Sequence, residues 1–367
     1  MMDKFEEDFS YKLYPIFSSS SLKSLFRGLH TRLDRVVLDG HTYILTITDE
    51  VFRRNSYPVS INTMIFDYSK DELVKIKNRI LRSVLLIFIN ACVVVFKAFK
   101  IDTNVFLNNY IFSTNFFSKQ WESLNINRLT TQIVYKYKRH AVLLRSVNEV
   151  QNQNLCKNLL ESGWIKLVSR QVYIFRNWDT VLHHHNTNID LGLLNSQRYL
   201  FKDPNKESIE DFKIAEKLYN KLYLDKYSQN NIQYTAEYLR ELYLSELITL
   251  KLLVDTQNNI TVGVVGMVGE GTVITAPIVG YDTDLDKHEA LYRRIIIYII
   301  KYAMDNKLLL NLSSGASNFK TMRGAEAHLE YMFVYTKHLP AYRRFIWWLL
   351  SIISIYLYGN LLQRLKL

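Results

Sequence analysis

The chain has 367 residues, with 46 Lys and Arg against 35 Asp and Glu, which gives a formal net charge of +11. Hydrophobic residues make up 48% of it, charged residues 22%, and there are only 12 Gly and 5 Pro, which excludes disordered and collagen-like chains. The length suggests about two domains. Two cysteines, Cys92 and Cys156, are too few for a disulfide framework or a cysteine-built zinc site.

The predicted elements of the first half alternate between strands and helices. Apolar residues on both sides of the turn dipeptide Asp39-Gly40 predict a hairpin over 36–48. Further along we expect a helix over 71–89, strands over 93–101 and 105–112, a helix after Ser118, a strand over 141–147, a helix over 153–162 and a strand over 166–175. The apolar run 84–96 is too short to cross a bilayer, which favours a buried helix that continues into a buried strand.

Residues 179–206 are rich in His, Asn and Asp, and this composition predicts a linker. Three adjacent histidines, 183–185, cannot all face one ion, so we expect a solvated loop and no metal site. The linker divides the chain into a domain over 1–178 and a domain over 207–340. For the second domain we expect helices over 208–222 and 235–247, strands over 250–254, 260–268 and 272–279, a helix over 289–304, a strand over 308–312, a short helix over 318–322 and a strand over 328–335.

The segment 341–367 is basic and apolar. Between Tyr331 and Leu367 there are five Lys or Arg and no acid, and Arg343 and Arg344 precede Trp347 and Trp348. Three alternatives stay open: a helix that lies in the plane of an anionic membrane surface, a helix packed on the body of the protein, and a membrane span. We expect a cytoplasmic protein, peripheral on the inner face of the membrane if the first alternative holds.

The order of elements in the second half, with the segments GYDTDLDKHEALYRR and NLSSGASNFKTMRGAEAHLEYMFVY, resembles the GNAT superfamily of acyltransferases. It is most similar to the acetyltransferase-like branch related to FemAB peptidyltransferases. The resemblance covers roughly 212–344, and 141–175 resembles a second, degenerate copy. It implies a tandem GNAT-like α/β fold, with mixed central sheets flanked by helices, and an acyltransferase that acts in cell-envelope, polysaccharide or lipid modification.

The resemblance implies an acyl-CoA co-substrate, but one position departs from it. Acetyl-CoA-dependent members carry a glycine-rich turn before the central helix, whose backbone N–H groups hold the pyrophosphate. Here the turn over 284–290 has no glycine, and its acids Asp284, Asp286 and Glu289 repel phosphate. The donor therefore stays open between acyl-CoA and aminoacyl-tRNA, which FemAB-like enzymes use.

Acyl transfer to an amine requires a base and a stabilised oxyanion. Asp282, at the end of a predicted strand, is a base candidate or a turn residue, and Glu330 is a second base candidate if its side of the strand lines the cleft. His328 shares that side. The resemblance draws attention to Phe319, Lys320, Arg323 and Gly324. Lys320 and Arg323 would clamp an anion from one helix face, or form a solvated surface pair.

We therefore expect an N-acyltransferase with Asp282, Glu330 and Lys320 as catalytic residues. The predicted substrate-binding residues are Tyr281, Ser313, Ser314, Phe319, Arg323 and Tyr234. The expected acceptor is a small-molecule, lipid or sugar amine; tRNA is a less favoured partner and DNA is not expected. The alternatives are a FemAB-type transferase that depends on aminoacyl-tRNA and a non-catalytic binding protein of the same fold.

Overall fold

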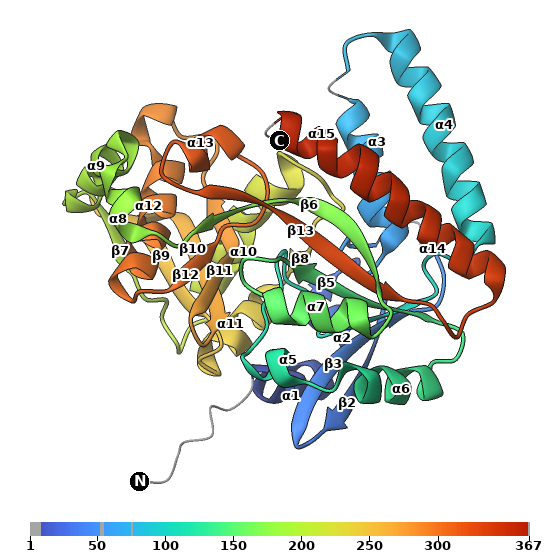
Figure 1. The fold of residues 1–367 in the computed structure, drawn as a ribbon. Coiled ribbons are helices and arrows are strands. Elements are labelled where there is room, and N and C mark those ends of the chain that lie inside the picture. The colour runs from blue at the N-terminus through green and yellow to red at the C-terminus, as the bar shows by residue number, and fades with distance from the viewer. Residues whose placement is uncertain (1–8, 52–54, 75, 366–367) are drawn as a thin grey trace.

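Eleven strands form one sheet in the order β2-β3-β4-β5-β13-β6-β12-β11-β10-β9-β7 (Figure 1). This is a computed structural model, and it describes residues 9–51, 55–74 and 76–365. Helices cover both faces of the sheet. A separate two-stranded sheet pairs β1 (Phe26–Arg27) with β8 (Gln233–Tyr234).

The two halves of the chain repeat one order of elements: three antiparallel strands, a helix, a strand parallel to the third, a second helix and a last strand. The first copy is β2 (Arg32–Leu38), β3 (His41–Thr48), β4 (Asn104–Leu107), α6 (Ile126–Lys136), β5 (Ala141–Val147), α7 (Gln153–Glu161) and β6 (Ile165–Phe175). The second copy is β9 (Thr249–Asp255), β10 (Ile260–Glu270), β11 (Val273–Tyr281), α12 (Leu291–Asp305), β12 (Leu309–Asn311), α13 (Ser317–Thr321) and β13 (Glu326–Tyr335). The fold is therefore tandem GNAT-like, as the sequence predicts.

The two copies exchange their last strands. β13 pairs with β5 of the first copy, and β6 pairs with β12 of the second copy, while β6 and β13 pair antiparallel at the centre. Among the strands of the described residues, β4–β5 and β11–β12 are the parallel pairs, and the other pairs are antiparallel. Leaving the edge strand β7 aside, the sheet order has the same pattern from either end, so the two copies form one continuous sheet.

Local sequence explains several of these elements. Asp39 and Gly40 both have positive φ, at 52° and 83°, which is the geometry of the two-residue turn that matches strand twist. Gly280 on β11 allows close approach of a helix, because a Cβ there would lie 2.5–2.7 Å from backbone atoms of Leu218 and Tyr219. Gly280 thereby fixes where α10 (Glu210–Asn220) crosses β11.

A second group of helices covers the opposite face of the sheet from α6 and α12. Its core includes Phe17, Tyr238, Leu239 and Val264, all fully or almost fully buried. The elements involved are α1 (Phe9–Ser19), α2 (Leu22–Leu25), α10, η3 (Lys221–Asp225) and α11 (Ala236–Leu244). The remaining short helices are α5 (Gln120–Ser123) and η4 (Lys287–Glu289).

The segment 179–206 is folded, contrary to the linker expected from its composition. It contains the end of α8 (Trp178–His183), then α9 (His185–Gly192), η2 (Leu193–Asn195) and the edge strand β7 (Tyr199–Lys202). Its polar composition is misleading because Asp190 is fully buried and paired with Arg293 and Arg323 of the second copy. The three histidines lie across the junction of α8 and α9.

The run 84–96 is neither buried nor partly a strand, which corrects both expectations. After η1 (Thr63–Asp67) and α3 (Tyr68–Leu73), the chain forms the 20-residue helix α4 (Arg79–Ala98), and none of its residues is buried. Asn78 starts α4, because its side chain accepts hydrogen bonds from the N–H groups of Ile80 and Leu81. The strand expected over 93–101 is thus the end of this helix, whose hydrogen bonds override the β-propensity of three consecutive valines.

The C-terminal segment packs on the body through one face. It consists of α14 (Ala341–Ile353), η5 (Ser354–Gly359) and α15 (Asn360–Leu365), and it buries Ile346 and Trp347. Arg343, expected at a lipid surface, is also buried, and its guanidinium donates to the carbonyls of Arg139, Lys100 and Thr103. Arg343 therefore holds the helix on the body and cannot reach a membrane; the side chains of Arg364 and Lys366 lie outside the described residues.

Candidate functional site

The parallel strands β11 and β12 separate after three residue pairs. Thr275 is the last β11 residue opposite β12, where it faces Asn311, and β11 then continues to Tyr281 paired only with β10. The chain after β12 turns to β6 instead: Leu312 donates to the Tyr173 carbonyl at 3.0 Å, and Tyr173 donates to the Ser313 carbonyl at 3.1 Å. The two strands thus splay between 277–282 and 312–314.

Lys320 holds one side of this splay. It is 4% exposed, and its Nζ donates to the carbonyls of Leu312, Ser313 and Ser314 at 2.7, 3.3 and 2.9 Å. Burial, together with the nearby positive charge of Arg170, lowers the pKa of Lys320 to about 7. Lys320 is therefore not a solvated surface lysine but a buried amine that titrates near neutral pH.

Glu330 lies at the centre of the exchanged strands. It is 2% exposed and faces Arg170 across the β13–β6 pair, with Arg170 Nε 2.7 Å from Glu330 Oε1. The other carboxylate oxygen, Oε2, is buried and has no hydrogen-bond partner among the described residues. Buried carboxylate oxygens normally have a hydrogen-bond partner. Oε2 lacks one in the described part of the chain, so it is free to accept a hydrogen bond or a proton from a bound molecule.

Two arginines that the sequence reasoning missed complete this region. Arg170 donates to the Ser113 carbonyl at 2.8 Å and to Thr114 Oγ1 at 3.0 Å. Arg145 on β5 is buried and donates to the carbonyls of Phe112 and Ser113 at 3.0 and 2.8 Å. We call Arg145, Arg170, Lys320 and Glu330 the central charged cluster. A signal was present in the sequence for Arg145, which follows four apolar residues of β5, but not for Arg170, which lies between Ser169 and Gln171 on β6.

The cluster also distinguishes the two copies. In the first copy, β4 and β5 are parallel up to the pair Leu107–Leu144, and Arg145 follows directly. Because Arg145 binds the loop over 109–113, the chain's own backbone occupies the place where these strands separate. In the second copy, the segment over 312–314 is hydrogen-bonded to β6 and not to β11. The second copy is thus the better candidate for a site at the splayed strands.

Asp282 is committed to an ion pair at the end of β11. Lys221 Nζ binds both Asp282 and Asp284, and the Asp284 N–H donates to Asp282 at 3.1 Å. Although partial burial opposes the change, these hydrogen bonds lower the pKa of Asp282. A lower pKa weakens a carboxylate as a base, so Glu330 is the stronger base candidate. Tyr281, next to Asp282, is half-buried and its hydroxyl accepts from Lys226 at 3.4 Å.

Arg323 does not share a clamp with Lys320. Its guanidinium binds Asp190 Oδ2 at 2.7 Å and the Phe319 carbonyl at 2.8 Å, and it lies 3.5 Å from the Phe319 ring centroid. Asp190 also binds Arg293 at 2.5 Å. The predicted anion clamp, and its alternative as a solvated pair, are both replaced by a buried ion pair that fixes α13 against α9.

The other predicted binding residues lie in different surroundings. Ser313 is half-buried with a positive φ of 59°, and Ser314 is exposed, so both border the splay. Phe319 packs against Tyr292, with ring centroids 4.9 Å apart. Tyr234 is 1% exposed and donates to the Ile111 carbonyl at 3.2 Å, which is a packing role. His328, on the same strand as Glu330, contacts Glu326 at 3.2 Å instead of the cluster.

The start of α12 is occupied by the chain's own groups. Glu289 binds Arg198 at 3.1 Å and accepts from the Tyr199 hydroxyl at 2.7 Å. Ala290 has a positive φ of 54°, a conformation that favours glycine. The turn before α12 is therefore held by contacts within the chain, with a non-glycine residue in the left-handed region.

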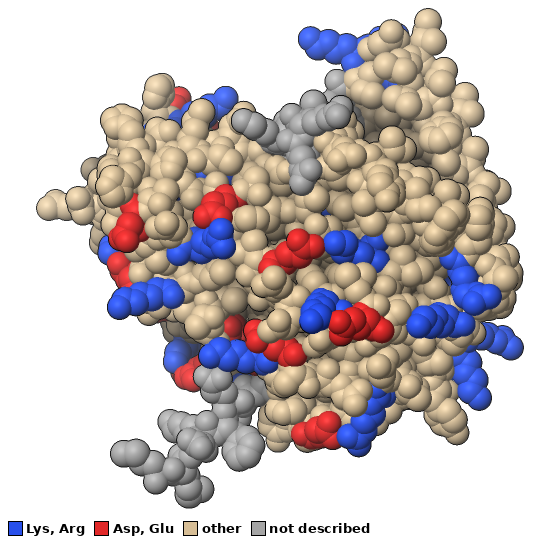
Figure 2. Space-filling model, viewed as in Figure 1, with Lys and Arg blue, Asp and Glu red and all other residues tan. Residues whose placement is uncertain are grey.

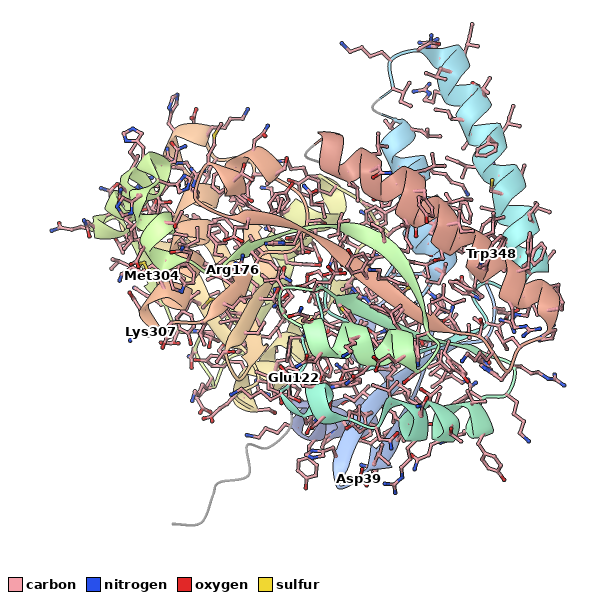
Figure 3. The ribbon with its side chains drawn as sticks, in the orientation of Figure 1. Asp39, Glu122, Arg176, Met304, Lys307 and Trp348 are labelled. Carbon is pink, nitrogen blue, oxygen red and sulfur yellow. The ribbon has the colours of Figure 1, made fainter. Side chains whose placement is uncertain are left out.

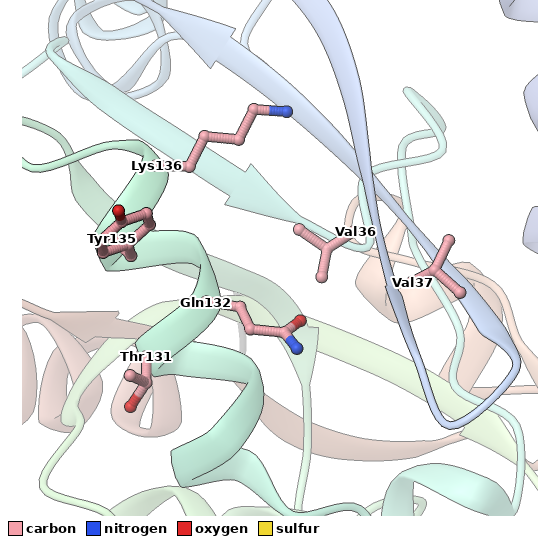
Figure 4. A pocket seen from close by; sticks show the side chains of 6 residues that line it. All are labelled: Val36, Val37, Thr131, Gln132, Tyr135 and Lys136. Carbon is pink, nitrogen blue, oxygen red and sulfur yellow. The ribbon is translucent and has the colours of Figure 1, made fainter.

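Other surface features do not coincide with these residues. An open hollow of about 560 Å³ is lined by side chains of β2 and α6, among them Val36, Val37 and Tyr135 (Figure 4). It contains none of the candidate residues. Among the residues that the structure describes, no group of three or more His, Cys, Asp and Glu is placed to hold a metal ion.

No family profile and no curated protein matches the sequence. Among solved structures, FemX matches with a TM-score of 0.50 at 11% identity, over 86% of this chain and 90% of FemX. L-PGS from Bacillus licheniformis matches at 12% identity over 62% of this chain and 76% of its own, with a TM-score of 0.43. A tandem GNAT protein from the clavulanic acid biosynthesis pathway matches at 9% identity over 65% and 76%, with a TM-score of 0.38. The chain thus shares its overall fold with FemX over most of the length of both chains.

Proposed function

We propose that the chain is a transferase that moves an acyl or aminoacyl group to an amine at the splay between β11 and β12. The observation that carries the proposal is the unpartnered Oε2 of Glu330, buried beside Arg170. Glu330 accepts the proton of the attacking amine. Lys320 and Arg170 supply positive charge for the oxyanion, and Lys320, with a pKa of about 7, is suited to return a proton to the leaving group.

The turn before α12, which has no glycine and carries Asp284, Asp286 and Glu289, favours an aminoacyl donor over free acyl-CoA. A CoA pyrophosphate on the usual turn would meet Asp284 and Glu289, whereas an aminoacyl ester on tRNA needs no pyrophosphate contact there. The FemX-like fold is compatible with either donor. A transferase that depends on aminoacyl-tRNA is therefore the favoured form of the proposal, and transfer from acyl-CoA is the second form. The acceptor is an amine on a small molecule, a lipid or a sugar.

The test compares two carboxylates of β13, one paired with Arg170 on β6 and the other with Arg176 directly after β6. Glu330→Gln removes the proposed base, and Glu326→Gln is the matched control, because Glu326 is half-buried and binds Arg176 at 2.7 Å. Group transfer from acetyl-CoA and from aminoacyl-tRNA to a panel of amines is followed by mass spectrometry. We expect Glu330→Gln to lose about 100-fold or more in turnover, within the range for general bases. The control should stay within about threefold.

A non-catalytic protein would give a different result. If neither donor supports transfer by the folded wild-type protein, or if Glu330→Gln turns over normally, the proposal is wrong. Thermal unfolding of both variants separates loss of activity from loss of structure, since removing one partner of a buried ion pair is destabilising.

A further inference from the structure

The helix α4 is apolar on its solvent side as well as on the side that faces the body. Ile87 and Val94, seven residues apart, lie on one outward face and are 70% and 69% exposed. Leu81, Phe88 and Val95 form a second exposed apolar face beside it. A helix that is apolar on several faces is not stable in water unless an apolar phase covers it.

The outer face of the C-terminal helices adds to this surface. Phe345 and Trp348 on α14, and Tyr356, Leu357 and Leu361 after it, are large and exposed. Trp348 projects from α14 on the side of the molecule that carries α4 (Figure 3). The Tyr342 ring on α14 lies 6.0 Å from the ring of Phe99, just after α4. We call the exposed apolar side chains of α4 and of α14–α15 the apolar platform.

The charges around the apolar platform are basic. No Asp or Glu occurs over 76–101 or over 341–365, while Lys77, Arg79, Lys97 and Lys100 flank or end α4 and Arg344 is exposed on α14. Figure 2 shows an uncharged area over α4 and α14, with basic side chains at the top of α4. Apolar surface bordered by cations complements a bilayer with anionic headgroups.

We propose that the apolar platform inserts into one leaflet of an anionic phospholipid bilayer. By length and composition, α4 and the segment Ala341–Leu362 both suffice to cross a membrane. The C-terminal helices cannot span, however, because Ile346, Trp347 and Ser351 are buried on the body and Arg343 is bound to three of its carbonyls. The platform therefore lies in the interface plane, with Trp348 and the exposed tyrosines at headgroup depth.

A lipid phase explains the platform better than a protein partner. A partner helix or groove would cover one stripe of α4, whereas α4 presents two adjacent apolar faces over 20 residues. The proposal does not depend on the transferase proposal. If both hold, the acceptor amine is reached from the membrane surface.

The test measures binding of the full-length protein to vesicles of 70% phosphatidylcholine and 30% phosphatidylglycerol. Ile87→Glu/Val94→Glu places two acids on the outward face of α4. The matched control, Tyr135→Glu/Leu160→Glu, places two acids at exposed apolar positions of α6 and α7, away from α4. We expect the α4 variant to lose at least tenfold in vesicle affinity and the control to keep it. Brominated lipids should quench wild-type fluorescence, and Trp348→Phe should remove most of that quenching.

Three results would overturn the proposal: no vesicle binding by the wild-type protein, equal binding by the α4 variant, or no quenching by brominated lipid. A wild-type dimer in solution that the α4 variant abolishes, without vesicle binding, would assign the platform to a second copy of the chain instead. Circular dichroism confirms folding of the variants, and the single substitution Ile87→Glu replaces the double variant if the latter unfolds.

Discussion

At the scale of single residues, the central charged cluster is unusual because its cations outnumber its acids. Arg145, Arg170 and Lys320 lie with one carboxylate, Glu330, in the interior of the sheet. Buried charges are costly unless they are paired or hydrogen-bonded. Here backbone carbonyls of two loops accept most of the hydrogen bonds, so Arg145 and Arg170 hold the loop over 112–114 and Lys320 holds the segment over 312–314.

Lys320 gives a prediction for stability and its pH dependence. In Lys320→Met the carbonyls over 312–314 lose their donor, and we expect a loss of about 1–3 kcal/mol in the free energy of unfolding. Because the pKa is about 7 in the folded protein and near 10.5 when unfolded, the unfolded state binds more protons between these values.

The wild-type protein should therefore gain stability as pH rises from about 7 to about 10, by up to roughly 1 kcal/mol per pH unit. Lys320→Met should lack this gain. Urea unfolding of both proteins at pH 7, 8.5 and 10 measures the difference, and other titrating groups cancel in the comparison. A difference that does not change with pH would mean that Lys320 stays charged in the fold.

At the scale of elements, amphipathic helices and strands with one buried face were predictable from sequence. The polar helix α9 and the full extent of the exposed apolar helix α4 were not. The strands and helices from β9 to β13 were predicted with small errors, because their apolar spacing and turn residues agree with their burial. The first half of α4 was predicted as a helix, but its continuation over 93–98 and its exposure were not. Apolar spacing shows where a water-excluding phase is needed, but not whether protein or lipid supplies it. The helix α9 was not predicted, because its Asp190 is of a residue type typical of loops, although it is buried in the structure.

The start of α12 gives a prediction at this scale. Asp284 and Glu289 carry negative charge beside the helix N-terminus, and Ala290 occupies the place of a glycine. We expect calorimetry with free CoA to show no binding in the low micromolar range. A low-micromolar dissociation constant that is lost in Lys287→Glu/His288→Glu, which adds two acids to the turn, would contradict this, since it would place the pyrophosphate on this turn.

At the scale of the whole molecule, the tandem repeat was predictable but the exchange of strands was not. The helices and strands of each copy are indicated by local sequence patterns. The pairing of β6 with β12, and of β13 with β5, depends instead on contacts between distant parts of the chain. For the same reason the sequence indicated Lys320 and Glu330 as candidates but not Arg170. The cross-strand pair Glu330–Arg170 exists only because β6 and β13 are neighbours.

The exchange predicts that the two copies fold together. Without residues 207–367, the first copy lacks β13, so β5 has a bare edge and β6 has lost both of its neighbours. Without residues 1–206, the second copy lacks β6, which lies between β13 and β12. Unpaired strand edges of this kind favour aggregation over folding.

We therefore expect each half, expressed alone, to be insoluble or to unfold without a cooperative transition. Coexpressed halves should copurify and show one transition, measured by circular dichroism. If residues 207–367 alone unfold cooperatively, with a melting temperature close to that of the full chain, the second copy is an independent domain and the exchanged strands are not required for its folding.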